Sequence, residues 1–210
     1  MNIDLLVFVP ACFALNLAFG PNNLLSMTHA AQQGIGYSLA ASTGRLPVFI
    51  LMILASALGM GVLLSTSALA FTVVKLFGAA YLIWLGIKLI RSRANVQTAQ
   101  IGDAKSNPHE GFRREVLAAS SNPKAILIFA AFFPQFVDVH QYWQSYLLLG
   151  SIFLVLEFIA IAIYAFAGRF AAAFAASKLH WLQRSSGGAM IVFGFLLLFS
   201  RPPARGTDVV

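Results

Sequence analysis

Six apolar segments separated by polar stretches dominate this sequence, and their length restricts the chain to few folds. Each is close to the ~20 residues that an α-helix needs to cross the hydrocarbon core of a bilayer. A chain in lipid must satisfy its backbone polar groups internally, so spanning segments of this length are expected to be helices. The predicted segments are residues 5–31, 37–64, 68–90, 116–137, 146–168 and 181–200.

The composition supports a membrane environment. Apolar residues make up 59% of the chain and charged residues only 10%, whereas in soluble domains about half of the residues are apolar and about a quarter are charged. The net charge of +7 does not predict nucleic-acid binding, because no basic stripe with interleaved aromatic residues stands apart from the apolar segments. The predicted fold class is an all-α integral membrane protein, with the lipid bilayer as its surroundings.

The distribution of positive charge predicts an orientation. If all six segments cross the membrane, the loops after the first, third and fifth lie on one side. Eight Lys and Arg residues lie near these loops and three on the other side, which places the loops in the cytoplasm and both termini in the periplasm. The first group is Arg91, Arg93, Lys105, Arg113, Arg114, Arg169, Lys178 and Arg184, and the second is Lys75, Arg201 and Arg205.

A polar stretch between the third and fourth segments divides the chain into two halves. Each half has an odd number of segments, so the two enter the membrane from opposite sides, as the inverted repeats of many transporters do. We expect a single membrane domain over residues 1–210. Its expected parts are repeat one at 4–91, a cytoplasmic loop at 92–111, repeat two at 112–200 and a C-terminal tail at 201–210.

The first apolar segment of each half contains a proline next to an asparagine. Proline removes a backbone donor and displaces the carbonyl four residues before it, so Pro21 frees the carbonyl of Leu17 and Pro123 that of Ala119. In lipid such carbonyls are tolerated only where protein covers them or where they line a wet cavity. We therefore expect a substrate site between the two interruptions. The alternative is that each proline merely kinks its helix.

Charged residues within the apolar segments are further candidates. Glu157 lies near the centre of the fifth segment, where an unpaired carboxylate costs about 3 kcal/mol, so it should face the interior, either as a coupling group or as a structural one. Three roles are open for Arg45: it could pair with Glu157, hold a substrate carboxylate or reach cytoplasmic headgroups. Lys124 lies deep enough for a functional role, although its long side chain can also extend toward the interface.

Enzyme and metal chemistry have little support in the sequence. The four histidines show no paired spacing that predicts a metal site, and no cofactor is expected. The nucleophile and metal motifs GxSxG, HExxH and CxxC are absent from the sequence. The chain is therefore not expected to be an enzyme.

Three motifs together resemble the LysE/RhtB family of bacterial amino-acid exporters. They are "GPN" at 20–22, "KLFGAAYLIWLGIKLIRS" at 75–92 and "NPKAILIFAAFFPQF" at 122–136, and the similarity extends from about residue 4 to residue 200. The resemblance implies an inner-membrane protein of six hydrophobic segments that exports amino acids, driven by a cation gradient. Arg45 and Pro47 depart from the apolar residues of many relatives, which leaves the substrate open. The family's signature residues correspond to Gly20, Pro21, Asn22, Asn122, Pro123 and Lys124.

The sequence thus predicts a secondary transporter whose amino-acid substrate lies between the broken first and fourth segments. Neutral hydrogen bonds would come from Asn22, Asn23 and Asn122. Lys124 or Arg45 would bind a carboxylate, and Glu157 would exchange a proton or bind an ammonium group. The alternative function is a passive channel or an assembly subunit. The exported compound, the coupling ion and the oligomeric state, a homo-oligomer included, stay open.

Overall fold

The computed structural model describes residues 3–66, 68–91, 107–170 and 175–199, and every element within these ranges is helical. The predicted all-α class is therefore confirmed. The elements are α1 (Leu5–Leu17), α2 (Pro21–Gln33), α3 (Ile35–Ser42), α4 (Arg45–Thr66), α5 (Ala68–Arg91), α6 (Pro108–Ser120), α7 (Pro123–Leu127), the π-helix η1 (Ile128–Phe132), the 3-10 helices η2 (Phe133–Phe136) and η3 (Val139–Gln141), α8 (Tyr142–Phe170) and α9 (Ala175–Phe199).

Both predicted interruptions are breaks between helices. The axes of α1 and α2 differ by 59°, and those of α6 and the helical stretch Pro123–Phe136 differ by 50°. Pro21 and Pro123 are each the first residue of the second helix. Proline is favoured there because its missing N–H would have no intrahelical acceptor. The chain therefore breaks before each proline, at the extended residues Gly20 and Asn122.

Two stretches, Ile35–Gly59 and Val139–Phe170, are long and apolar enough to cross a membrane on their own, and each bent pair counted as one span raises the number to four. The described apolar parts of α5 and α9 are shorter, at Leu76–Lys88 and Gly187–Leu196. Helix α6 begins at Pro108 and is capped by Asn107, so the last residues of the expected 92–111 loop belong to this helix or its cap. Residues 92–106 and the C-terminal tail lie outside the described residues.

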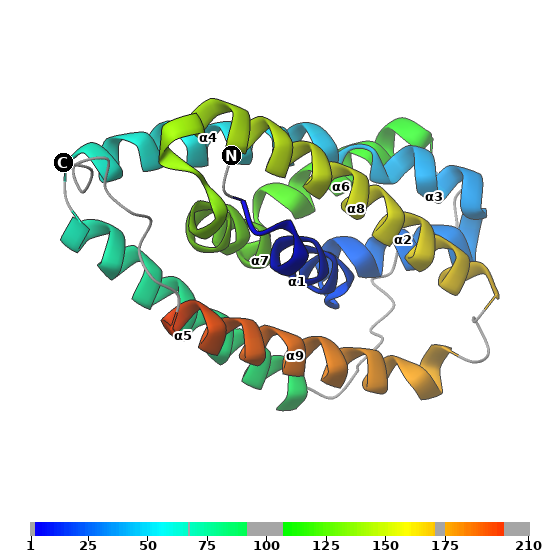
Figure 1. Cartoon of the computed structure of the whole chain (residues 1–210). Helices are drawn as coiled ribbons and strands as arrows, with labels where there is room; N and C mark the ends of the chain where they lie inside the picture. The colour runs from blue at the N-terminus through cyan, green and yellow to red at the C-terminus, as the bar shows by residue number, and fades with distance from the viewer. Residues whose placement is uncertain (1–2, 67, 92–106, 171–174, 200–210) are drawn as a thin grey trace.

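Helices α5 and α9 lie side by side along one edge of the molecule, and α1, α2 and α7 lie between this pair and α4, α6 and α8 (Figure 1). The α5–α9 contact needs two glycines, since a Cβ atom on either Gly86 or Gly187 would lie 2.6 Å from the other's carbonyl oxygen. Gly194 contacts the carbonyl of Ala79 farther along, so the two helices run antiparallel. Small residues allow such close approach between helices in lipid.

An aromatic cluster fills the space between α1, α4, η1 and α8. The rings of Phe129 and Phe153 are 4.8 Å apart, and Phe49 and Phe133 pack edge-on against Phe153. Phe8 of α1 joins the cluster through Phe133. Edge-to-face pairs of this kind contribute about 0.5–1.5 kcal/mol each beyond the burial of their area. The aromatic cluster therefore joins the two bent pairs to the two long helices α4 and α8.

Candidate functional site

The junction between α3 and α4 places an arginine in the interior of the protein. Gly44 in this junction packs against the backbone carbonyl of Phe112 in α6, and a Cβ atom on Gly44 would overlap that carbonyl. The close approach brings Arg45, the first residue of α4, next to Glu115 of α6. The Arg45 side chain is completely buried, with 0% of its surface exposed.

The Arg45 guanidinium binds two carboxylates from different helices. Its Nε and Nη2 atoms donate to the two oxygens of Glu115 at 3.1 and 3.0 Å. Its Nη1 atom donates to Oε1 of Glu157 in α8 at 2.9 Å. The planar guanidinium suits such forked contacts. Of the three alternatives for Arg45, the pairing with Glu157 is observed, and contact with membrane headgroups is wrong because the side chain is buried.

The remaining donors of Arg45 are taken up by α2. Nη1 also donates to Oδ1 of Asn23 at 3.1 Å, and Nη2 donates to the carbonyl of Asn22 at 2.6 Å and to the Ser26 hydroxyl. A buried charge is tolerated when its partners and hydrogen bonds offset the loss of water. The network therefore ties α2, α4, α6 and α8 to one guanidinium.

Glu115 is a member of this site that the sequence prediction missed. Its side chain is fully buried, and it accepts hydrogen bonds from Ser42 at 3.1 Å and from the Asn22 amide at 3.0 Å, besides those of Arg45. It precedes the predicted segment 116–137 by one residue, so the apolar pattern alone does not place it inside the membrane region. A signal was present, because Gly111, Glu115 and Ala119 recur at helical spacing, and all three are buried in α6.

The structure brings the two interruptions together. Nδ2 of Asn122 donates to Oδ1 of Asn22 at 2.9 Å, which joins the start of α7 to the start of α2. Oδ1 of Asn122 accepts the backbone N–H of Lys124 at 3.0 Å and so caps α7. Because Asn22 also binds Glu115, the asparagines connect both interruptions to the Arg45 network.

The carbonyls at the first interruption have partners from other segments. The Leu17 carbonyl accepts the Tyr164 hydroxyl of α8 at 2.7 Å, so the expectation that Pro21 frees this group is confirmed. The Asn23 amide donates to the carbonyls of Asn16 at 2.8 Å and Ala18 at 3.0 Å. These bonds fix the 59° bend between α1 and α2.

The second interruption differs from the first. The Ala119 carbonyl was expected to be free, but it accepts the backbone N–H of Asn122 at 3.1 Å. That expectation is wrong because the last turn of α6 tightens into i to i+3 hydrogen bonding, which satisfies the carbonyl locally.

Lys124 extends from α7 to the end of α1. Its Nζ atom donates to the carbonyls of Leu15 at 3.1 Å and Ala18 at 2.9 Å. Gly20 lies alongside the lysine, since a Cβ atom on Gly20 would be 3.7 Å from both Cε and Nζ of Lys124. The ammonium group therefore binds backbone oxygens in this structure, where the sequence suggested a substrate carboxylate.

A small cavity lies where these groups meet. Its volume is about 10 Å³, close to what one water molecule needs. An amino acid is larger, so the site is closed in this conformation. The residues that line the cavity are Asn16, Gly20, Asn22, Asn23, Phe49, Asn122, Lys124, Ala125, Ile128, Phe153 and Glu157.

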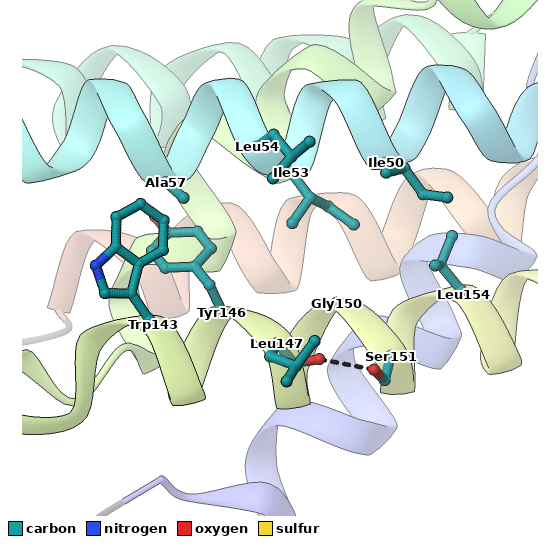
Figure 2. A pocket seen from close by; sticks show the side chains of 10 residues that line it. All are labelled: Ile50, Ile53, Leu54, Ala57, Trp143, Tyr146, Leu147, Gly150, Ser151 and Leu154. Atoms are coloured by element: carbon teal, nitrogen blue, oxygen red, sulfur yellow. Dashed lines mark hydrogen bonds between the residues drawn. The ribbon is translucent and has the colours of Figure 1, made fainter.

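A larger cavity of about 380 Å³ lies between α4 and α8, away from the charged residues (Figure 2). Its lining is almost entirely apolar, and Leu54, Leu147 and Trp143 on its rim are exposed. The Ser151 hydroxyl in its wall donates to the Leu147 carbonyl of the same helix (Figure 2). This lateral groove suits hydrocarbon and offers little for recognising a polar solute.

Residues 13–201, which contain both interruptions and the whole Arg45 network, match the family model described as LysE type translocator. The chain belongs to this family. The resemblance inferred from the three sequence motifs is therefore confirmed. This LysE-type translocator is a membrane transporter of small molecules rather than an enzyme. No solved structure matches the chain.

Curated relatives of this LysE-type translocator cover most of its length. It is 32% identical to the homoserine/homoserine lactone efflux protein of Salmonella typhimurium over 190 residues. The match covers 89% of this chain and 92% of the relative. It is 31% identical over 195 residues to the leucine efflux protein of an Enterobacter species, covering 89% of each. An uncharacterized membrane protein of Vibrio cholerae is 36% identical over 146 residues, or 69% of this chain and 71% of the relative.

Proposed function

We propose that this LysE-type translocator is a secondary transporter that exports amino acids or close derivatives across the bacterial inner membrane, driven by a cation gradient. Relatives named as efflux proteins for homoserine, homoserine lactone and leucine support the substrate class. The observation that carries the proposal is the closed polar site between two broken helices, in which Arg45 binds Glu115 and Glu157. Broken helices around a central site are typical of transporters.

In the proposed architecture six segments cross the membrane as two inverted repeats. The pair α1–α2 corresponds to α6–α7 with η1 and η2, α3–α4 corresponds to α8, and α5 corresponds to α9. The reciprocal contact between Gly86 and Gly187 supports a two-fold relation between the halves, because each glycine meets the other's carbonyl at the same 2.6 Å. In this arrangement both termini lie in the periplasm and residues 92–106 in the cytoplasm.

The two carboxylates have different roles in the proposed mechanism. Glu115 accepts hydrogen bonds from Arg45, Ser42 and Asn22 and holds the guanidinium in position. Glu157 accepts a hydrogen bond from Arg45 and lines the central cavity, so of these two carboxylates it is the one next to the space for a ligand. We assign the exchanged proton to Glu157.

Coupling follows from competition at Glu157. The ionised carboxylate attracts the ammonium group of an amino acid, whereas the protonated one does not. A proton that binds from the periplasm therefore promotes release of the substrate on that side, and the proton leaves toward the cytoplasm when the site returns. Proton influx is thereby exchanged for amino-acid export. Rocking of one repeat against the other would expose the site to each side in turn.

The test combines two assays of the wild-type protein. Cells that express it are loaded with individual amino acids, homoserine or homoserine lactone, and export is followed against a vector control. The purified protein is then reconstituted in liposomes, where an imposed pH gradient should drive the selected substrate against its own gradient. Flux that only follows the substrate gradient would instead indicate a passive channel, and absence of flux for every compound would favour an assembly subunit.

A further inference from the structure

We infer that the C-terminal end of α1, together with Asn16, forms a binding site for a primary ammonium group, and that Lys124 occupies this site when no substrate is bound. The identity of the natural ligand, the ammonium group of the exported amino acid, rests on the proposed function. The site itself rests on contacts in the structure.

The first observation is the position of the Lys124 ammonium group. Nζ donates to the carbonyls of Leu15 at 3.1 Å and Ala18 at 2.9 Å. Leu15 also accepts the backbone N–H of Ala18 at 3.2 Å and Ala18 also accepts the Asn23 amide at 3.0 Å, so each carbonyl uses a second lone pair for the ammonium group. The helix dipole makes this end of α1 negative. The break before Pro21 ends α1 inside the protein, so these oxygens form a cation-binding surface beside the cavity.

The second observation is an unused acceptor in the same cavity. Oδ1 of Asn16 is buried without a hydrogen-bond partner in the described residues, and Asn16 lines the cavity with Lys124. The Asn16 amide nitrogen donates to the Phe153 carbonyl at 3.4 Å, which turns the other end of the amide away from α8. A primary ammonium has three N–H donors, and Lys124 uses two of them on Leu15 and Ala18. Lys124 does not reach the Asn16 oxygen in this conformation, so this acceptor is left for the ammonium group of a ligand in the cavity.

Glu157 and the glycine at the break complete the site. The Glu157 carboxylate lines the same cavity and interacts electrostatically with Lys124. Gly20 at the break lies next to the lysine side chain, since a Cβ atom there would be in ordinary contact with Cε and Nζ of Lys124 at 3.7 Å. The site thus presents neutral oxygens and one carboxylate to a cation, which suits an ammonium group.

Lys124 then acts as a tethered competitor of the substrate. An incoming ammonium group takes over the carbonyls and displaces the lysine, and the lysine returns when the substrate leaves, so the carbonyls have a cationic donor in both states. Homoserine, homoserine lactone and leucine all carry a primary ammonium, whereas the lactone lacks a free carboxylate. An ammonium site is therefore the feature that could serve the compounds named for both relatives.

The experiment uses Lys124→Met, which removes the ammonium group but keeps a side chain of similar length. Thermal unfolding of the purified full chain in detergent is measured in chloride salts of ethylammonium, tetramethylammonium and sodium at equal ionic strength. We expect ethylammonium to raise the midpoint of the variant by about 2–4 °C relative to the other salts. The wild type should respond less than the variant, because the tethered Lys124 competes with ethylammonium for the site. Adding Asn16→Leu should at least halve the response of the variant.

Equal responses to ethylammonium and tetramethylammonium, or no response, would overturn the ammonium site, and an equal response to sodium would assign it to a metal cation instead. If Lys124→Met aggregates in plain buffer, the yield of monodisperse protein extracted in each salt gives the same comparison. Amino-acid export with no ethylammonium response would overturn only this inference. An ethylammonium response in a protein that exports no amino acid would support the site and overturn the proposed function.

Discussion

Nη1 of Arg45 lies 2.9 Å from Oε1 of Glu157, although 112 residues separate them in the sequence. The contact joins the start of α4 to the middle of α8, and the same guanidinium reaches Glu115 of α6. One buried cation thus binds carboxylates from two other helices. Removal of the Arg45 guanidinium would leave Glu115 and Glu157 without this cationic partner.

The first prediction concerns this guanidinium. Arg45→Leu should destabilise the protein by about 3–5 kcal/mol, because it leaves buried carboxylates unpaired. Arg45→Lys should have an intermediate effect, since lysine keeps the charge but cannot form the forked contact. Thermal unfolding in detergent measures both, with the exposed Arg169→Gln as the control. A wild-type unfolding midpoint for Arg45→Leu would show that the carboxylates are neutral in the folded protein.

The second prediction concerns the break between α1 and α2. Tyr164→Phe removes the donor to the Leu17 carbonyl. A buried acceptor left without a partner costs about 1–3 kcal/mol, so the variant should unfold at a lower temperature and export more slowly. Tyr81→Phe on α5 is the matched control. Unchanged stability and export in Tyr164→Phe would mean that water or another group satisfies this carbonyl.

The third prediction tests the close packing of α2 on α8. A Cβ atom on Gly168 would overlap the Met27 carbonyl. Gly168→Ala should therefore push the helices apart and destabilise the closed conformation by about 1–3 kcal/mol. Gly36→Ala is the control because nothing lies within 4 Å of a Cβ atom there. Equal unfolding temperatures for the two variants would contradict the packing described here.

Much of this arrangement could be predicted from residues whose chemistry conflicts with their surroundings. Pro21 and Pro123 predicted broken helices because proline cannot continue a backbone ladder. The carboxylate of Glu157 in an apolar segment predicted an interior partner, and Arg45 provides it. In each case a single residue would be costly in lipid without a specific local structure.

Other parts of the site were beyond such reasoning. Glu115 lies just outside an apolar segment, so hydrophobicity alone gave no reason to place it in the interior. The partners of Lys124 are the carbonyls of Leu15 and Ala18, and side-chain patterns carry no information about which backbone groups meet. His29 lies near the end of the predicted segment 5–31, and the sequence does not show that it is buried in α2, where it packs against Tyr37.

The fourth prediction addresses the orientation in the membrane. In a variant with Cys12→Ala, single cysteines at Thr98 or Thr207 are treated with an impermeant thiol reagent in intact cells. The charge asymmetry predicts labelling at 207 and none at 98 until the cells are opened. The control is labelling of both positions in opened cells. The reverse pattern in intact cells would overturn the proposed orientation, and with it the side from which the coupling proton is proposed to bind.

The central claim, that proton influx is exchanged for amino-acid export at Glu157, is tested most directly by Glu157→Gln. Glutamine keeps the size of the side chain and can still accept a hydrogen bond from Arg45, but it cannot bind and release the coupling proton.

The measurement follows transport of labelled substrate in proteoliposomes that contain equal amounts of wild type or Glu157→Gln, with and without an imposed pH gradient. We expect the pH gradient to accelerate substrate transport by the wild type several-fold and to leave the transport rate of Glu157→Gln unchanged. The variant should still exchange labelled for unlabelled substrate. Acceleration of Glu157→Gln equal to that of the wild type would contradict the account and place the coupling proton on another group.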